Sequence, residues 1–179
     1  MGKSLNFAAA MAACVGLCVT PAASQGGPGT ANSFGSASAV MQSVSAADVA
    51  GMMTEMRVST QLVRAEAAAE PIMLAETESG ARFLFYFIGC KTPAQAAGCD
   101  GVVVSTALPS AGLSYDALNS FNGEASVTVA VNVASEKMVM FGRNIIIAGG
   151  HGRELFQATV YLFLVDVSGF VKKNAGVAS

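Results

Sequence analysis

Two cysteines in the stretch FIGCKTPAQAAGCDGV, Cys90 and Cys99, are the residues best suited to chemistry in this sequence. Thiol-redox enzymes typically carry Cys-x-x-Cys at the start of a helix, where the helix dipole lowers the pKa of one thiol. Here eight residues separate the two cysteines, and they lie between two predicted strands. That spacing favours a structural disulfide across the mouth of a hairpin loop. A redox or regulatory role for the pair is the alternative.

Other chemistry finds little support in the residue types. A zinc site needs four ligands, and His151 is the only histidine in the chain. His151 stands in AGGHGREL, a Gly-rich turn before a helix, which can hold an anion. The turn lacks the Lys and the Ser or Thr of a phosphate-binding loop, so we expect a structural role. No GxSxG motif is present either. We therefore expect no catalytic residue, no cofactor and no metal.

The N-terminal segment is typical of an export signal. Lys3 precedes an apolar run from 7 to 19, and Ala22-Ala23-Ser24 fits the small residues of a cleavage site. We predict a signal peptide over 1–24, a mature chain that begins at Gln25, and a flexible Gly- and Ser-rich linker over 25–44. Lipidation of Cys14 or Cys18 fits poorly, because the residues before them do not match a lipoprotein signal.

Export also bears on the cysteines. Cleavage after residue 24 removes Cys14 and Cys18 and leaves Cys90 and Cys99 as a pair. Outside the cytoplasm such a pair tends to be oxidised, which again favours the disulfide. The predicted location is periplasmic or secreted.

Composition places the rest of the chain in one folded domain, over 45–175. Hydrophobic residues make up 53% of the 179 residues and charged residues 12%, which is enough apolar material for a core. The net charge of −2 gives no basic face for nucleic acid.

Periodicity predicts an α+β fold with helices packed on one face of an antiparallel sheet. A helix begins at Ser45, which with Asp48 forms a capping box, and strands follow in 57–66 and 71–78. Phe83, Phe85 and Phe87 alternate along a strand that leads to Cys90. Another strand over 100–108, a short helix over 114–123, and a hairpin over 125–147 come next. In that hairpin we expect Val127, Val129, Val131 and Val133 to face the core and Gly142 to form a bulge.

The last helix, over 151–173, is apolar nearly all round. We expect Leu155, Ala158, Leu162, Val165 and Phe170 to share one stripe. The polar back that a one-sided helix needs is largely missing, so the sequence predicts an interface that contains Tyr161, Phe163 or Val167. The partner is then an unidentified protein or peptide, or a second copy in a homodimer. Membrane association is disfavoured, because Gln157, Asp166 and Lys172 interrupt or end the apolar run.

The segments FLFYFIGC, CDGVVVSTAL, LSYDALNSFNGEASVTVAVN and GRNIIIAGGHGRELFQATVYLFLVDVSGFV together resemble the YbjN-like domain. The closest matches are Asn119-x-x-Asn122, Gly149-Gly150 and the aromatic strand before the cysteine pair. The resemblance spans residues 45–173; Phe121, where the family often shows Trp, and the low charge of the final helix depart from it.

YbjN-like domains are described as bacterial sensory transduction regulators, with a fold similar to that of type III secretion chaperones. The resemblance implies a non-enzymatic, exported regulatory or chaperone-like module that binds protein. It carries over no catalytic residues. An exported thiol-redox protein that uses Cys90 and Cys99, or a membrane-associated structural protein, is the alternative.

Overall fold

The structure, a computed structural model, describes residues 40–63, 71–110 and 112–174. The predicted signal peptide and residues 25–39 of the predicted flexible linker lie outside the described residues. Residues 40–44 of that linker are instead part of the fold, with a short strand at Val40–Met41 and a buried Val44. The helices are α1 (Ala46–Glu55), α2 (Tyr115–Glu124) and α3 (Arg153–Lys173), with short 3-10 turns η1 (Pro93–Gln95) and η2 (Ala134–Glu136). The strands are β1 (Val40–Met41), β2 (Val58–Val63), β3 (Ile72–Thr77), β4 (Arg82–Ile88), β5 (Gly101–Pro109), β6 (Val129–Val133), β7 (Met138–Ile146) and β8 (His151–Gly152).

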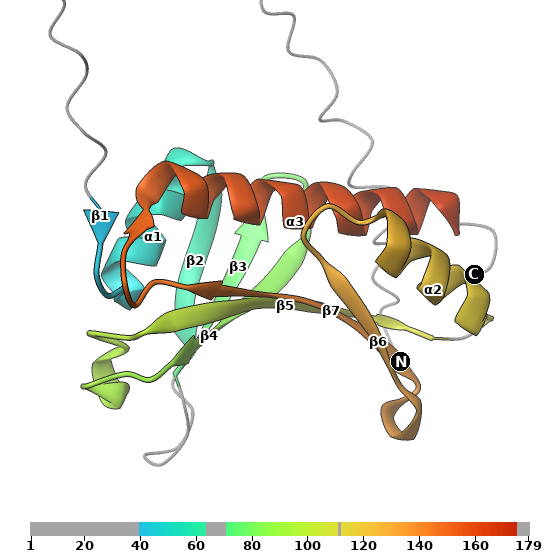
Figure 1. Ribbon diagram of the computed structural model, residues 1–179, viewed down its shortest axis with the longest axis horizontal. Coiled ribbons are helices and arrows are strands. Elements are labelled where there is room, and N and C mark those ends of the chain that lie inside the picture. Colours follow the sequence, from blue (N-terminus) through green and yellow to red (C-terminus); the bar gives the residue numbers. More distant parts are fainter. Residues whose placement is uncertain (1–39, 64–70, 111, 175–179) are drawn as a thin grey trace, which may run out of the picture.

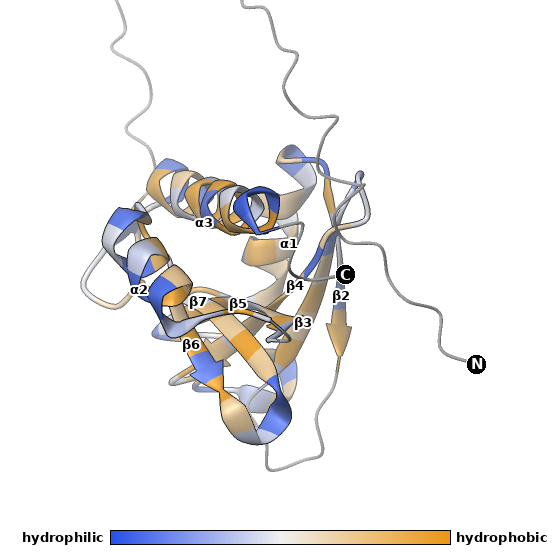
Figure 2. Cartoon of the chain, turned by 90° about the vertical axis from the view of Figure 1, so that its right-hand side faces the viewer, coloured by the Kyte–Doolittle hydropathy of each residue, from blue (hydrophilic) through white to orange (hydrophobic). Residues whose placement is uncertain are grey.

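Six of the strands form one antiparallel sheet in the order β2-β3-β4-β5-β7-β6, and β1 pairs with β8 as a separate two-stranded ladder. All three helices lie on the same side of the six-stranded sheet, and α3 runs across it (Figure 1). The predicted α+β class is confirmed. Figure 2 shows hydrophobic colouring over much of the sheet and along α3.

The start of α1 follows the sequence prediction. The Ser45 hydroxyl accepts from the backbone N–H of Asp48, and the Asp48 carboxylate accepts from the backbone N–H of Ser45 at 2.8 Å. These bonds satisfy N–H groups that a helix start leaves free. Val49, Met52 and Met53 then point into the core, where they are fully buried. The three residues recur at helical spacing because one face of α1 packs on the sheet.

Aromatic rings dominate the core between β4 and α3. Phe83, Phe85 and Phe87 are buried on the helix side of the sheet, as the alternation predicts. The ring of Phe83 lies 6.4 Å from that of Phe163, and the ring of Phe85 lies 6.2 Å from that of Phe156, measured between centroids. These contacts fix α3 above the centre of the sheet.

Two predictions for the hairpin were wrong: the valines of its first strand do not face the core, and Gly142 does not form a bulge. Val129 and Val131 are more than half exposed, whereas Ala130 is buried. Ala130 lies opposite Phe141, whose ring packs 5.3 Å from Phe121 of α2. A small side chain at 130 leaves room for those rings, so the valines occupy the other face. Both ladders run through Gly142 without a bulge.

The edge strand β6 is tied to α2 by one side chain. The Asn122 amide oxygen accepts from the backbone N–H of Ala130 at 2.7 Å, and the Asn122 amide nitrogen donates to the Ala130 carbonyl at 3.0 Å. The side chain thus imitates a neighbouring strand at this edge. This contact gives the second asparagine of Asn119-x-x-Asn122 a structural role.

Candidate functional site

The outward face of α3 carries an apolar surface. Residues on the inner face, Phe156, Val160, Phe163, Val167 and Phe170, are buried. Half a turn away lie the residues that we call the outer stripe: Leu155, Ala158, Tyr161, Leu162 and Val165. Leu155 is 58% exposed, Tyr161 60% and Val165 47%. No charged residue lies within the stripe between its two ends, so α3 presents uncharged surface to the outside over about three turns.

The structure corrects the predicted interface in two of its three residues. Phe163 is fully buried and Val167 is 1% exposed, so neither can contact a partner while the domain stays folded. Tyr161 alone is exposed. The predicted stripe is correct for Leu155, Ala158, Leu162 and Val165, which share the outward side of α3, but Phe170 is buried on the inner face. The helix is apolar on both sides, and hydrophobic periodicity alone does not distinguish the two.

A groove between α2 and α3 continues the outer stripe. Its volume is about 510 Å³, and Val165 belongs to both surfaces. Phe121 and Phe170 contribute apolar lining, while Glu124 and Lys173 form an ion pair at 3.2 Å beside them. An apolar side chain with a polar neighbour would fit such a lining.

Asp166 also lines the groove, but its carboxylate is engaged in holding the chain before β6. Its Oδ1 accepts from the backbone N–H of Ser126 at 3.1 Å, and its Oδ2 accepts from the N–H groups of Val127 and Thr128 and from the Thr128 hydroxyl. Burial raises the pKa of the Asp166 carboxyl, but these hydrogen bonds outweigh it and leave the pKa below the usual value. Asp166 therefore joins α3 to the hairpin rather than offering a free carboxylate.

We expect Asp166→Asn to lower the free energy of unfolding at pH 7 by about 1–3 kcal/mol, because an amide replaces part of a charged acceptor. A carboxyl with a lowered folded pKa stabilises above its unfolded pKa, about 3.9, and loses this effect as the pH falls through the folded value. The difference in the free energy of unfolding between wild type and variant should therefore become smaller in acid. Urea unfolding at pH 7 and near pH 3 measures it.

The matched control for this prediction is Glu136→Gln, which removes an exposed carboxylate from the β6–β7 turn. It should leave stability nearly unchanged at both pH values. An Asp166→Asn deficit that stays constant between pH 7 and pH 3 would contradict the role of the charge.

Cys90 and Cys99 form a disulfide, as predicted. It closes the loop between β4 and β5, and Cys99 is fully buried while Cys90 is partly buried against the core. The loop docks on the residues before α1: Val44 and Cys99 exchange two backbone hydrogen bonds of 2.9 and 2.8 Å, and Ala96 accepts from the N–H of Ala46. The bridge therefore stabilises the loop to which the start of the domain is hydrogen-bonded, and it is compatible with an oxidising, exported location.

His151 takes part in secondary structure. It pairs with Met41 in the β1–β8 ladder, and Nε2 of its partly buried ring has no hydrogen-bond partner among the described residues. The neighbouring Arg153 forms an ion pair with Glu55, which joins α3 to α1. Within residues 40–63, 71–110 and 112–174, no group of three or more His, Cys, Asp or Glu is arranged to hold a metal.

The length of α3 raises the question of a membrane. In the part of the chain that the structure describes, α3 is the one helix long and apolar enough to cross a bilayer by length and composition, a criterion that the core helix of a soluble protein also meets. The five buried residues of its inner face pack on the sheet as in such a core helix.

Comparison of the chain with protein-family models finds no match, and comparison with curated proteins finds none. The YbjN-like resemblance therefore stays a prediction from the sequence.

Proposed function

We propose that this chain is an exported, non-enzymatic, YbjN-like module that binds a partner protein or peptide through the outer stripe of α3. The observation that carries the proposal is the exposure of Leu155, Tyr161 and Val165 on a helix whose other face is already buried. Exposed apolar residues gathered on one element, with polar residues beside them, are typical of protein interaction sites.

The groove between α2 and α3 supports a peptide as the ligand. It shares Val165 with the stripe, and its Phe121 and Phe170 lie beside the Glu124–Lys173 ion pair. A partner helix could place one apolar side chain in the groove and lay its apolar face along the stripe.

Two findings favour this function over a thiol-redox enzyme or a membrane anchor. A redox enzyme typically carries Cys-x-x-Cys at a helix start, whereas these cysteines are nine positions apart in a loop between two strands, with Cys99 fully buried and Cys90 partly buried against the core. A membrane-spanning α3 would have to leave the sheet and give up the ring contacts of Phe156 and Phe163.

Photo-crosslinking from the native cell envelope tests the proposal. A photo-reactive amino acid at position 161 should capture a discrete partner, and Val165→Glu in the same protein should abolish the capture by placing a charge in the stripe. The matched control carries the photo-reactive residue at Lys137, in the exposed β6–β7 turn. N-terminal sequencing of the recovered chain checks export and should begin at Gln25.

Equal capture from positions 161 and 137 would contradict the proposal, as would capture that Val165→Glu leaves unchanged. Circular dichroism of the Val165→Glu protein shows whether the fold is retained, so that a lost contact is separated from unfolding.

A further inference from the structure

The six-stranded sheet has a second face, opposite the helices, that none of the described residues covers (Figure 1). Side chains alternate along a strand, so the neighbours of buried Phe83 and Phe85 point to this side. We call it the open face. Every strand of the sheet gives it an apolar residue: Val63, Leu74, Leu84, Val103, Met140 and Val131. Val131 is 55% exposed, Val63 44% and Met140 40%.

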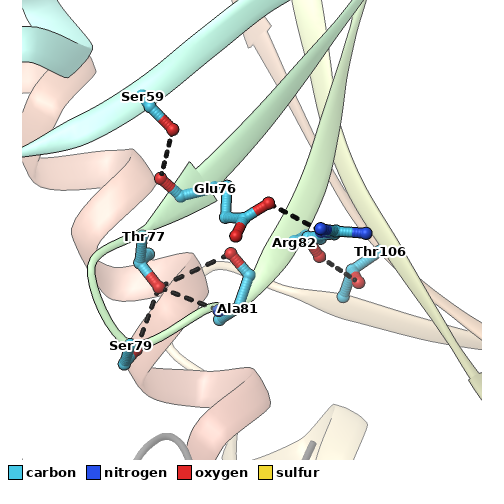
Figure 3. A network of polar contacts seen from close by, with 7 residues as sticks. All are labelled: Ser59, Glu76, Thr77, Ser79, Ala81, Arg82 and Thr106. Atoms are coloured by element: carbon cyan, nitrogen blue, oxygen red, sulfur yellow. Dashed lines mark hydrogen bonds and ion pairs between the residues drawn. The ribbon is translucent and has the colours of Figure 1, made fainter. Parts of the chain in front are cut away.

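Charge is nearly absent from the open face. Among its described strand residues, Glu76 and Arg82 are the charged ones, and they form an ion pair at 2.7 Å. The pair sits where β3 turns into β4, in a polar cluster in which Thr77 contacts Ser79 and Ala81 and the Ser59 hydroxyl donates to the Glu76 carbonyl (Figure 3). The polar cluster therefore lies at one end of the face. The described strand residues of the rest of the face carry no charge and are apolar apart from Gln61, Tyr86, Ser105 and Asn144.

The size of the open face matches a dimer interface. Six strands at about 4.8 Å spacing span about 29 Å, and strands of five to nine residues extend about 17–30 Å. The face thus covers about 500–900 Å², close to the roughly 800 Å² that each partner contributes to a stable interface. An extended peptide would cover only a fraction of it, and the described strand residues of this face include no unpaired basic side chain for a membrane surface.

We propose that the open face is the interface of a homodimer, in which two copies of this chain pack their sheets face to face. Sheets pack in this way with side chains interdigitated about 10 Å apart. The second copy supplies an apolar surface of the same extent, and the Glu76–Arg82 cluster falls on the rim, where polar groups keep contact with water. The outer stripe of α3 stays free on the far side of each copy, so the dimer goes beyond the proposed partner binding and does not depend on it.

Analytical ultracentrifugation of the mature protein over a range of concentrations tests the dimer. Wild type should sediment as a dimer. Leu84→Lys places a charge on the central strand β4, and Val131→Lys places one on the edge strand β6, where the exposed side chain makes unfolding a lesser risk. Each should raise the dissociation constant at least about tenfold, because it would bury a lysine charge without a partner in an apolar interface. Tyr161→Lys, on the opposite side of the molecule, is the matched control and should leave the dimer intact.

A wild-type protein that stays monomeric at the highest concentration would overturn the inference. A monomer that binds vesicles or an added peptide would overturn it as well. A dimer that Tyr161→Lys dissociates would place the interface on α3, and one that tolerates folded Val131→Lys and Leu84→Lys would place it elsewhere. Partner capture from position 161 is measured separately, so either idea can fail while the other stands.

Discussion

Replacing Cys90 and Cys99 together with alanine is expected to lower the free energy of unfolding by about 2–4 kcal/mol and to leave the fold recognisable. The bridge closes a loop over a sequence separation of nine residues and so restricts the unfolded chain. It also shapes the loop that exchanges two backbone hydrogen bonds with Val44. Alanine suits this test because Cys99 is fully buried, and a serine hydroxyl there would need a partner.

Guanidinium unfolding of the purified protein measures the loss. Reduction of the wild type should reproduce most of it, whereas the same reductant should have no effect on the double alanine variant. Partner capture through α3 should survive in the variant, since the bridge lies on another part of the molecule. Two reactive thiols in the native protein, or a variant as stable as the wild type, would rule out a stabilising disulfide.

Local signals predicted much of this fold. Ser45 and Asp48 form the capping box that their spacing indicates, and Phe83, Phe85 and Phe87 face the core as their alternation indicates. Each signal depends on neighbours within a few positions. The cysteine pair belongs to the same class, because two strand ends joined by a short loop leave their sulfurs close together.

The errors arose where two faces of an element are equally apolar. In α3, Leu155 and Val165 are as hydrophobic as Phe163, and only contact with the sheet decides which face is buried. In β6, valine is favoured in any strand, but the residue that faces the core is the small Ala130, opposite Phe141, whose ring packs against Phe121. Burial was therefore set by the shape of the neighbouring element and not by hydropathy.

Long-range polar contacts left no signal in the sequence. The Asp166 carboxylate accepts from N–H groups about 40 positions earlier, and nothing local marks the residue as a support for the hairpin. From the sequence, the only sign of the open face was that several strands are apolar on both sides. Its nearly complete lack of charge follows from the strand register, which pairs Glu76 with Arg82 and aligns the apolar residues beside them.

Substitutions at Phe163 and Tyr161 should distinguish most clearly between a core position and a surface position on α3. Phe163→Ala is expected to lower the free energy of unfolding by about 3–5 kcal/mol, because it empties a fully buried site. The ring of Phe163 packs 6.4 Å from that of Phe83, so the substitution removes a contact between α3 and the sheet. Tyr161→Ala, two residues away and 60% exposed, should change stability by less than about 0.5 kcal/mol. Chemical denaturation of both variants under the same conditions gives the comparison.

Substituting glutamate at the same two positions should make the difference in stability between the two variants larger. Phe163→Glu would bury a carboxylate without a partner, at a cost comparable to the whole stability of a small domain, so the chain should not fold. Tyr161→Glu should fold normally and lose the partner, because the charge then lies in the outer stripe. Circular dichroism separates the two results. A folded Phe163→Glu protein that has lost only a binding partner would restore Phe163 to the interface and refute the assignment of the inner and outer faces of α3.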